Sequence, residues 1–434
     1  MIKQTLGKIV AGLGKNKFFS NTIWIISGKV IQMALQLVVG MITARYLGPS
    51  NYGVIGYTAS YIAFFTSISN LGFCNIAVKE LLDKPDEQGK SLGTMIGFRI
   101  FSGLLSMISI LVLVYILDNG DALIIRVAFL QSLVLVFQSF EMITYWYQSR
   151  LESKVSVKIE TAAYIIVAVY KIAILILQKN VAWFAFTTAL DALVIAVFLL
   201  ISYYWKKEQK LSFSIGCGKQ ILSRSYHFII SGLMVAIYTQ MDRIMLKQML
   251  NEYMVGLYSA AMNISSMWGF VLTALINSSQ PVIIASKKKD NDLYIKQIKR
   301  LYAAIIWIGI LVAGSISICS RFLVGMLYGE NYLPASDTLV ISVWYMIFAM
   351  LGTARGIWCM CENKVKYIKY FLSIGAIVNV VLNYYMIPIY GPAGAAFATL
   401  VTQAVTSVIA PILFKETKIH SRYIMEAFLL KGIR

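Results

Sequence analysis

The chain has 434 residues, of which 59% are apolar and only 14% are charged, and its mean hydropathy is +0.71. No soluble domain of this size can hide so much apolar surface, so the composition excludes a soluble protein and indicates one that spans a membrane. The formal net charge is +19, but the basic residues fall mainly in every second loop, which is the distribution of cytoplasmic loops. We therefore expect membrane lipids and no nucleic acid among its partners.

Twelve hydrophobic runs of about 20 residues, the length that crosses a bilayer, follow one another along the chain. The first six are residues 22–44, 52–72, 92–117, 122–147, 155–177 and 181–204. The second six are residues 221–249, 254–284, 301–319, 335–361, 367–387 and 393–414. The basic segment 205–220 separates the two sets.

The predicted fold is therefore an all-α membrane protein with twelve transmembrane helices in two six-helix lobes, residues 22–204 and 221–414. Residues 1–21 form an interfacial segment, 205–220 a basic linker and 415–434 a tail. The basic residues of the N-terminal segment, the C-terminal tail and every second loop place both termini in the cytoplasm, as an even number of spans requires. A faint repeat supports the two lobes, because parallel repeats build a central cavity between two bundles. Four residues recur 201 positions later: Tyr52, Val54, Tyr57 and Ala59 as Tyr253, Val255, Tyr258 and Ala260.

Several predicted helix junctions contain short motifs. Residues 44–53 are ARYLGPSNYG, Asp242 and Arg243 precede VGLYSAA at 255–261, and NVVLN at 379–383 precedes IPIYGPAGAA at 387–396. In this order, the motifs resemble the junctions of bacterial polysaccharide transporters. This is the O-antigen and capsule flippase family of the multidrug/oligosaccharidyl-lipid/polysaccharide exporter superfamily. Together with the twelve spans, the resemblance covers nearly the whole chain.

The resemblance implies a transporter that moves an undecaprenyl-pyrophosphate-linked oligosaccharide across the bacterial inner membrane. It also implies a polysaccharide polymerase and chain-length proteins as partners. At the junctions, Gly48, Pro49, Gly391 and Pro392 are predicted to end helices and to form tight turns. Arg45 either belongs to such a turn or contacts the phosphate of the ligand at the outer mouth of the transporter.

Six basic side chains lie within the apolar runs: Lys29, Arg99, Arg126, Lys171, Arg243 and Arg355. A charge at mid-bilayer costs roughly 2.5–3.5 kcal/mol, so it needs a partner, a wet cavity or a charged ligand. Arg99 and Arg126 lie near span ends and are expected to extend to the membrane interface. Lys171 is expected at the depth of Asp191 on the next span, where the two would form a salt bridge. Lys29, Arg243 and Arg355 remain as candidates for binding a pyrophosphate.

Polar side chains that share a helical face add further candidates for substrate binding. Gln36 lies seven residues after Lys29 in the first span, and Asn277 belongs to a polar stripe of the eighth span. Tyr61 is a candidate for stacking on a sugar ring. Packing between helices, or a place at the membrane interface for the aromatic ring, is the alternative role for these residues.

Four acidic residues within the spans are candidates for ion coupling: Glu141, Glu160, Asp191 and Asp242. Hairpin geometry puts Glu141 and Glu160 at similar depth on neighbouring helices, where two close carboxylates share a proton or hold Na⁺. The alternative is that each carboxylate pairs with a basic residue at the cytoplasmic interface. No metal site, cofactor or catalytic group is expected, because the five cysteines and two histidines lack the spacing of metal ligands.

Two other functions of multi-span membrane proteins agree less well with this sequence. Cation-coupled multidrug efflux on the same fold would favour acidic or aromatic recognition, whereas basic residues outnumber acidic ones six to four in the spans. A membrane polymerase or ligase would need a large outer loop, and the longest predicted one, 320–334, contains only two charged side chains. No phosphate-binding glycine loop occurs in the sequence. We therefore expect an ion gradient, the membrane potential or consumption of the product to drive transport.

Overall fold

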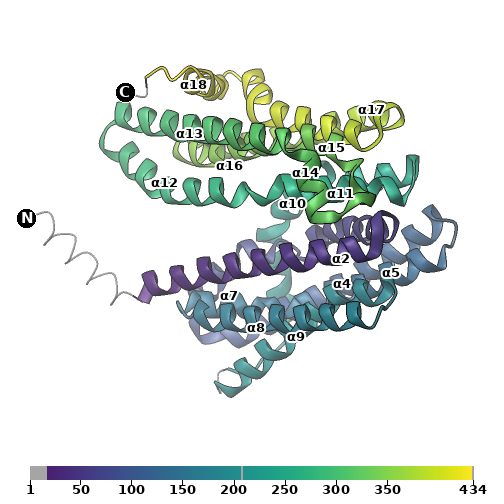
Figure 1. Cartoon of the computed structure of the whole chain (residues 1–434). Helices are drawn as coiled ribbons and strands as arrows, with labels where there is room; N and C mark the ends of the chain where they lie inside the picture. Colours follow the sequence, from purple (N-terminus) through teal and green to yellow (C-terminus); the bar gives the residue numbers. More distant parts are fainter. Residues whose placement is uncertain (1–16, 207–208, 433–434) are drawn as a thin grey trace, which may run out of the picture. The chain divides into compact units, whose positions relative to one another are not determined.

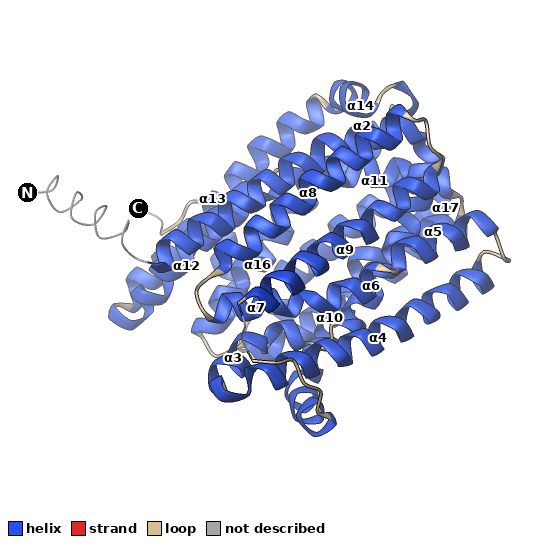
Figure 2. Ribbon diagram, turned by 90° about the horizontal axis from the view of Figure 1, so that it is seen from below, coloured by secondary structure: helices blue, strands red, loops and turns tan. Residues whose placement is uncertain are grey.

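The computed structural model describes residues 17–206 and 209–432, and the side chains from Val38 onward. All regular elements in this part of the chain are helices, as the apolar runs predict (Figure 2). Nine of the described helices are long and apolar enough to cross a membrane. Most of the predicted interfacial segment 1–21 lies outside the described residues. The count of twelve spans and the cytoplasmic placement of both termini stay predictions.

Two compact units make up the described chain. The first contains the residues up to Tyr46 together with Tyr61–Leu233, and the second contains Leu47–Ser60 and the residues from Met234 onward. Two long helices, α2 (Lys17–Ser69) and α10 (Ile215–Met249), therefore contribute residues to both units. The lobe boundaries 22–204 and 221–414 stay predictions.

The first unit packs its helices around an aromatic core. Trp146 lies edge-on to Tyr147 and Tyr203, with ring centroids 4.9 and 5.0 Å apart, and all three side chains are buried. Besides α2 and α10, the α-helices of this unit are α3 (Ala77–Asp83), α4 (Gln88–Leu117), α5 (Ala122–Ser132), α6 (Val134–Phe137), α7 (Met142–Ser149), α8 (Ser153–Ile176) and α9 (Val181–Trp205). The 3-10 turn η3 (Gln138–Glu141) joins α6 to α7, and α9 packs against α5 and α8 (Figure 2).

In the second unit, the long helices α12 and α13 pack against each other. Helix α17 contains a break (Figure 1). The helices of this unit after α10 are α11 (Glu252–Met267), α12 (Gly269–Lys289), α13 (Asn291–Ile318), α14 (Ser320–Tyr328), α15 (Ala335–Ser342), α16 (Tyr345–Cys361), α17 (Ile368–Ala404) and α18 (Lys418–Phe428). A π-helical turn, η6 (Val405–Ile409), and a 3-10 turn, η7 (Ala410–Leu413), follow α17.

Polar side chains at the span ends fix where several helices begin. The carboxylate of Asp121 accepts hydrogen bonds from the first backbone N–H groups of α5. Asn251 caps α11 in the same way, and Asp290 caps α13. Each cap satisfies backbone donors that have no partner within their own helix.

The two Gly-Pro pairs of the junction motifs break helices, as the sequence predicts. Gly48 has φ 72° within α2, and Gly391 has φ 57° within α17. Glycine adopts positive φ at little cost, and the proline that follows cannot donate a backbone hydrogen bond to the preceding turn. The chain therefore changes direction at both positions.

Two further motif glycines allow a close helix crossing within the second unit. A Cβ atom at Gly53 would lie 1.8 Å from the carbonyl oxygen of Glu252, and one at Gly256 would lie 1.9 Å from that of Pro49. Backbone atoms of α2 and α11 thus touch where both helices lack side chains. Small residues permit such approach between membrane helices.

The segment after α9 lies along α4 in the first unit. The backbone N–H of Gly89 donates to the Gln209 side chain at 2.9 Å, and that of Ser212 donates to the Gly89 carbonyl at 3.3 Å. The backbone N–H of Ser214 donates to the Thr94 hydroxyl at 3.1 Å. A Cβ atom at Gly89 would lie 2.5 Å from the carbonyl oxygen of Lys210. The described part of the predicted linker is therefore fixed to a transmembrane helix.

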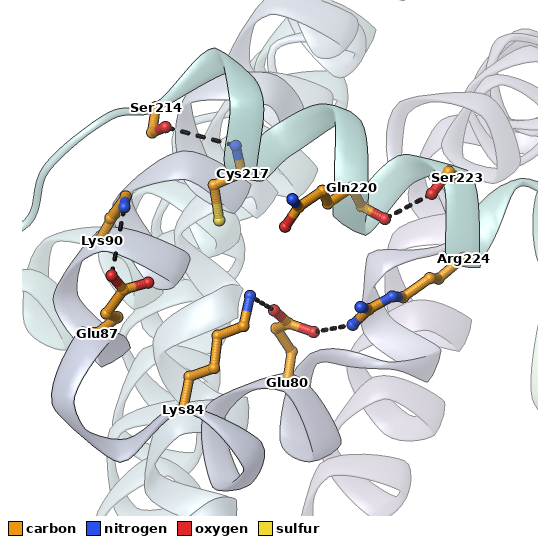
Figure 3. Close-up of polar contacts among 9 residues, drawn as sticks. All are labelled: Glu80, Lys84, Glu87, Lys90, Ser214, Cys217, Gln220, Ser223 and Arg224. Atoms are coloured by element: carbon orange, nitrogen blue, oxygen red, sulfur yellow. Dashed lines mark hydrogen bonds and ion pairs between the residues drawn. The ribbon is translucent and has the colours of Figure 1, made fainter.

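A buried carboxylate fastens α3 to the start of α10 (Figure 3). Glu80 is 3% exposed and lies between Lys84 and Arg224, at 2.8 and 3.0 Å. The hydrogen bond to Glu80 raises the pKa of Lys84. Nearby, the hydroxyl of Ser225 donates to the Leu71 carbonyl at 2.7 Å. These contacts hold the turn after α2 against α10.

Candidate functional site

Three predicted coupling residues of the first unit line one cavity. Glu141 ends η3, Glu160 lies on α8 and Asp191 lies on α9, and their cavity has a volume of about 300 Å³. Tyr164 and Thr188 also line it. Three carboxylates in a medium of low dielectric repel one another, and a shared proton or a monovalent cation relieves that repulsion. Glu141 and Glu160 thus lie near each other, as the hairpin geometry leads us to expect, and their common depth in the membrane stays a prediction.

A second cavity of the same unit is lined by both Lys171 and Asp191. The predicted salt bridge between them is wrong, because no ion pair joins these two side chains in the part of the chain that the structure describes. The volume of this cavity is about 150 Å³, and Thr187 and Thr188 complete its polar wall. Oxygen Oδ1 of Asp191 is buried and accepts no hydrogen bond from the described residues. Asp191 therefore borders both cavities with one oxygen left for another partner.

The sequence-based expectation for Arg99 is wrong. Arg99 is only 2% exposed, and its guanidinium donates a hydrogen bond to the side chain of Asn70 at the end of α2. It is also close enough to Glu141 for an electrostatic interaction. A deep charge that finds a polar partner inside the bundle has no need to reach the interface. Arg126 is exposed on α5, as expected.

Asp242 of the second unit accepts hydrogen bonds from three helical segments. The side chains of Asn379 and Asn383 donate to its Oδ1 at 3.0 and 2.6 Å. The hydroxyls of Tyr258 and Thr399 donate to its Oδ2. Asn379 and Asn383 precede the break at Gly391 and Thr399 follows it, so one carboxylate that is 1% exposed joins α10, α11 and both parts of α17.

The spacing of two asparagines in the sequence indicates this cluster. Asn379 and Asn383 are four residues apart in an apolar span, so they occupy one face of α17. Buried amides need hydrogen-bond partners. That pattern predicts a polar partner on a neighbouring helix, which is Asp242.

Two predicted substrate-binding arginines also lie in the second unit. Arg243 is partly buried, and its Nε and Nη1 donate to Ser259 and Gln240, both at 3.1 Å. Arg355 is 4% exposed and donates to the carbonyl of Thr406 in the π-helical turn η6. Neither arginine forms an ion pair with an acidic side chain of the described residues. Both cations thus keep a charge that no carboxylate neutralises.

The structure places the remaining substrate-binding candidates in different surroundings. Arg45 and Asn277 are exposed, on α2 and α12, whereas Tyr61 is buried in the first unit. Lys29 and Gln36 lie on the part of α2 whose side chains are outside the described residues. None of these positions changes the sequence-based proposal, which stays a prediction.

His420 of α18 is a buried titratable group close to Arg355. It is 0% exposed and contacts the rings of Tyr302 and Trp358, with centroids 5.4 and 5.2 Å away. Neither ring nitrogen has a hydrogen-bond partner among the described residues. Burial, and then the nearby Arg355 guanidinium, lower the pKa of His420 well below its usual value. The folded protein therefore holds this imidazole neutral.

This lowered pKa predicts acid sensitivity. Below about pH 6.5 the unfolded chain gains a proton at His420 that the folded chain does not, which costs about 1.4 kcal/mol of folding stability per pH unit. His420→Phe should therefore flatten the fall of the melting temperature between about pH 7 and pH 5. Thermal unfolding of the detergent-solubilised protein measures it, with His227→Phe, an exposed position on α10, as control. Equal pH dependence in wild type and His420→Phe would contradict the assignment.

The fold and these buried polar groups define a class, the multi-helix membrane proteins. The structure matches the lipid II flippase MurJ, inward closed, with a TM-score of 0.70 at 14% identity, covering 95% of this chain and 92% of that one. It matches an inward-facing MATE-family multidrug resistance transporter of the MOP superfamily with a TM-score of 0.67 at 12% identity, covering 92% and 98% of the two chains. These similarities show the fold.

The sequence comparisons identify the family within this class. Residues 18–287 match the polysaccharide biosynthesis protein family, and the chain belongs to it. The capsular polysaccharide biosynthesis protein CapF of Staphylococcus aureus is 21% identical over 70% of this chain and 78% of its own length. The probable flippase AglR of Haloferax volcanii is 27% identical over 40% of this chain and 37% of its own length. The protein is thus a multi-pass membrane protein of the polysaccharide biosynthesis protein family, which agrees with the polysaccharide transporter motifs of the sequence.

Proposed function

We propose that this protein flips an undecaprenyl-pyrophosphate-linked oligosaccharide, an O-antigen or capsule repeat unit, across the bacterial inner membrane by alternating access. The observation that carries the proposal is the pair Arg243 and Arg355, two cations within apolar helices that no described carboxylate neutralises. A diphosphate would supply the missing negative charge, and arginine suits it because its planar donors bind phosphate oxygens in pairs. Multidrug efflux is the alternative, and the family match favours the polysaccharide substrate.

Complementation of a strain that lacks the flippase tests this function. Lys29→Ala, Arg243→Ala and Arg355→Ala should each reduce surface polysaccharide by about tenfold or more while the amount of protein in the membrane holds. Arg355→Lys keeps the charge and should retain more activity than Arg355→Ala. Arg126→Ala removes an exposed cation of α5 and is the control. Normal polysaccharide in all three alanine variants would remove these residues from the substrate site.

We further propose that the cavity of Glu141, Glu160 and Asp191 takes up a proton or Na⁺ during transport. The shared cavity supports this role, because protonation or cation binding changes the repulsion among its carboxylates. Asp242 is a second candidate. Its own carboxylate and the Thr399 hydroxyl beside it offer oxygen ligands of the hard kind that Na⁺ prefers.

Glu141→Gln should abolish the pH or Na⁺ dependence of transport, because glutamine keeps the shape of the side chain but cannot ionise. The measurement is the initial rate of flipping of a labelled lipid-linked oligosaccharide in vesicles, under varied pH and Na⁺. Glu330→Gln, at an exposed position outside the cavity, should behave like wild type. Dependence that persists unchanged in Glu141→Gln would discard the coupling site.

A further inference from the structure

An open groove runs between the end of the last span and the C-terminal helix α18. Its volume is about 610 Å³, within the range of about 300–1,000 Å³ that ligand sites occupy. Val408 and Ile412 form one side, and Ile419 and Met425 of α18 form another. The candidate span ends at Leu413, so the groove lies where acyl chains give way to lipid headgroups.

Most of the groove wall is apolar, and the one hydroxyl in it already has a hydrogen-bond partner. Ile412, Ile419 and Met425 are 45%, 47% and 60% exposed, although each would be better placed away from water. The hydroxyl of Ser421, also in the wall, donates to the carbonyl of Val408 at 2.6 Å. A hydrocarbon chain therefore fits this surface better than a polar molecule does.

Two basic side chains, Lys418 and Arg422, line the same groove one helical turn apart. Arg422 uses Nε to contact Glu426 at 2.7 Å, and its side chain is 76% exposed. Lys299 contacts the other oxygen of Glu426 at 2.5 Å, and these two contacts lower the pKa of Glu426. The carboxylate of Glu426 is therefore already paired with two basic side chains.

The charge that remains is positive. Lys418 pairs with no acidic side chain in the described part of the chain, and the terminal nitrogens of Arg422 donate to no described residue. A phosphate group is the natural partner, because arginine binds its oxygens in pairs and lysine adds a point charge. Basic pockets at the membrane surface bind anionic lipid headgroups for this reason.

We propose that this groove is a binding site for one anionic phospholipid. An acyl chain lies against Val408, Ile412, Ile419 and Met425, and the headgroup phosphate contacts Lys418 and Arg422. The site is separate from the polar clusters of the spans, and it does not depend on which oligosaccharide is flipped. It would stabilise the packing of α18 against α13, which the Lys299–Glu426 ion pair already holds.

Native mass spectrometry of the full-length protein in detergent tests the site. The protein is titrated with dioleoyl phosphatidylglycerol or with dioleoyl phosphatidylcholine, which have the same acyl chains. Wild type should retain one phosphatidylglycerol preferentially. Removing each positive charge should weaken that binding about fivefold, so Lys418→Gln with Arg422→Gln should weaken it about 25-fold.

Two matched variants separate charge from shape. Lys288→Gln with Lys289→Gln removes the same charge from the last turn of α12 and should bind like wild type. Ile412→Trp fills the groove from an exposed position and should weaken phosphatidylglycerol binding with all charges present. The proposal would be overturned if wild type retained both lipids equally or if the two double variants lost binding equally. It would also be overturned if millimolar inorganic phosphate displaced the lipid.

Discussion

Asp242→Ala should unfold the second unit or leave it inactive. Four donors from α11 and α17 point at a carboxylate that is 1% exposed, and removing it takes away the acceptor that they share. Breaking a buried charged network in this way costs about 3–5 kcal/mol. For a unit of this size, that loss corresponds to a fall of about 10 °C in melting temperature. Thermal unfolding in detergent and the yield of monodisperse protein measure it.

Asp242→Asn distinguishes the charge from the hydrogen bonds. Asparagine keeps one acceptor oxygen in the same place, so it should recover part of the stability that alanine loses. If Asp242 also binds a coupling ion, Asp242→Asn will fold but lose Na⁺ or pH dependence of flipping. A normal melting temperature for Asp242→Ala would show that these bonds do not hold the unit together.

Gly53→Ala should be at least as damaging, although it adds one methyl group. The new Cβ would meet the carbonyl oxygen of Glu252 at 1.8 Å, and a backbone oxygen cannot rotate away as a side chain does. The helices must separate, and the cost should exceed about 3 kcal/mol. Gly256→Ala clashes with the carbonyl of Pro49 from the other side and should have the same effect.

Gly314→Ala is the matched control, because a Cβ atom there meets nothing within 4 Å. In the interior of α13, alanine is the better helix former by about 1 kcal/mol, so this variant should be neutral or more stable. Fluorescence-detected size-exclusion chromatography and thermal unfolding compare the variants. If Gly53→Ala matched Gly314→Ala in yield and melting temperature, the close crossing of α2 and α11 would be unimportant for folding.

Much of the fold was predictable because a bilayer leaves the chain few choices. Long apolar runs must satisfy their backbone groups internally, which makes them helices, and the Gly-Pro pairs at 48–49 and 391–392 break those helices as expected. The crossing of Gly53 and Gly256 was not predictable in the same way. It depends on which helices become neighbours, and a single sequence contains no direct record of that pairing.

The same distinction between local geometry and tertiary packing applies to the polar groups. Glu141 and Glu160 were placed at one depth because a short turn joins their helices, and they do line one cavity. Arg99 was misplaced because its partner, Asn70, lies at the end of another span. The distance of a residue from the end of its span does not reveal a partner that another helix supplies. Three of the four partners of Asp242 belong to α17, more than a hundred residues away in the chain, so the sequence around Asp242 does not reveal them.

The attachment of the segment after α9 constrains how this protein can change in length. Gln209, Ser212 and Ser214 form hydrogen bonds with Gly89 and Thr94 of α4, so one extra residue between Gln209 and Ser214 would shift the later contacts out of register. Epitope tags and protease sites inserted between Gln209 and Ser214 should therefore be rejected. The charge of this segment suggests a loose linker. Its hydrogen bonds to α4 instead fix the position at which α10 starts.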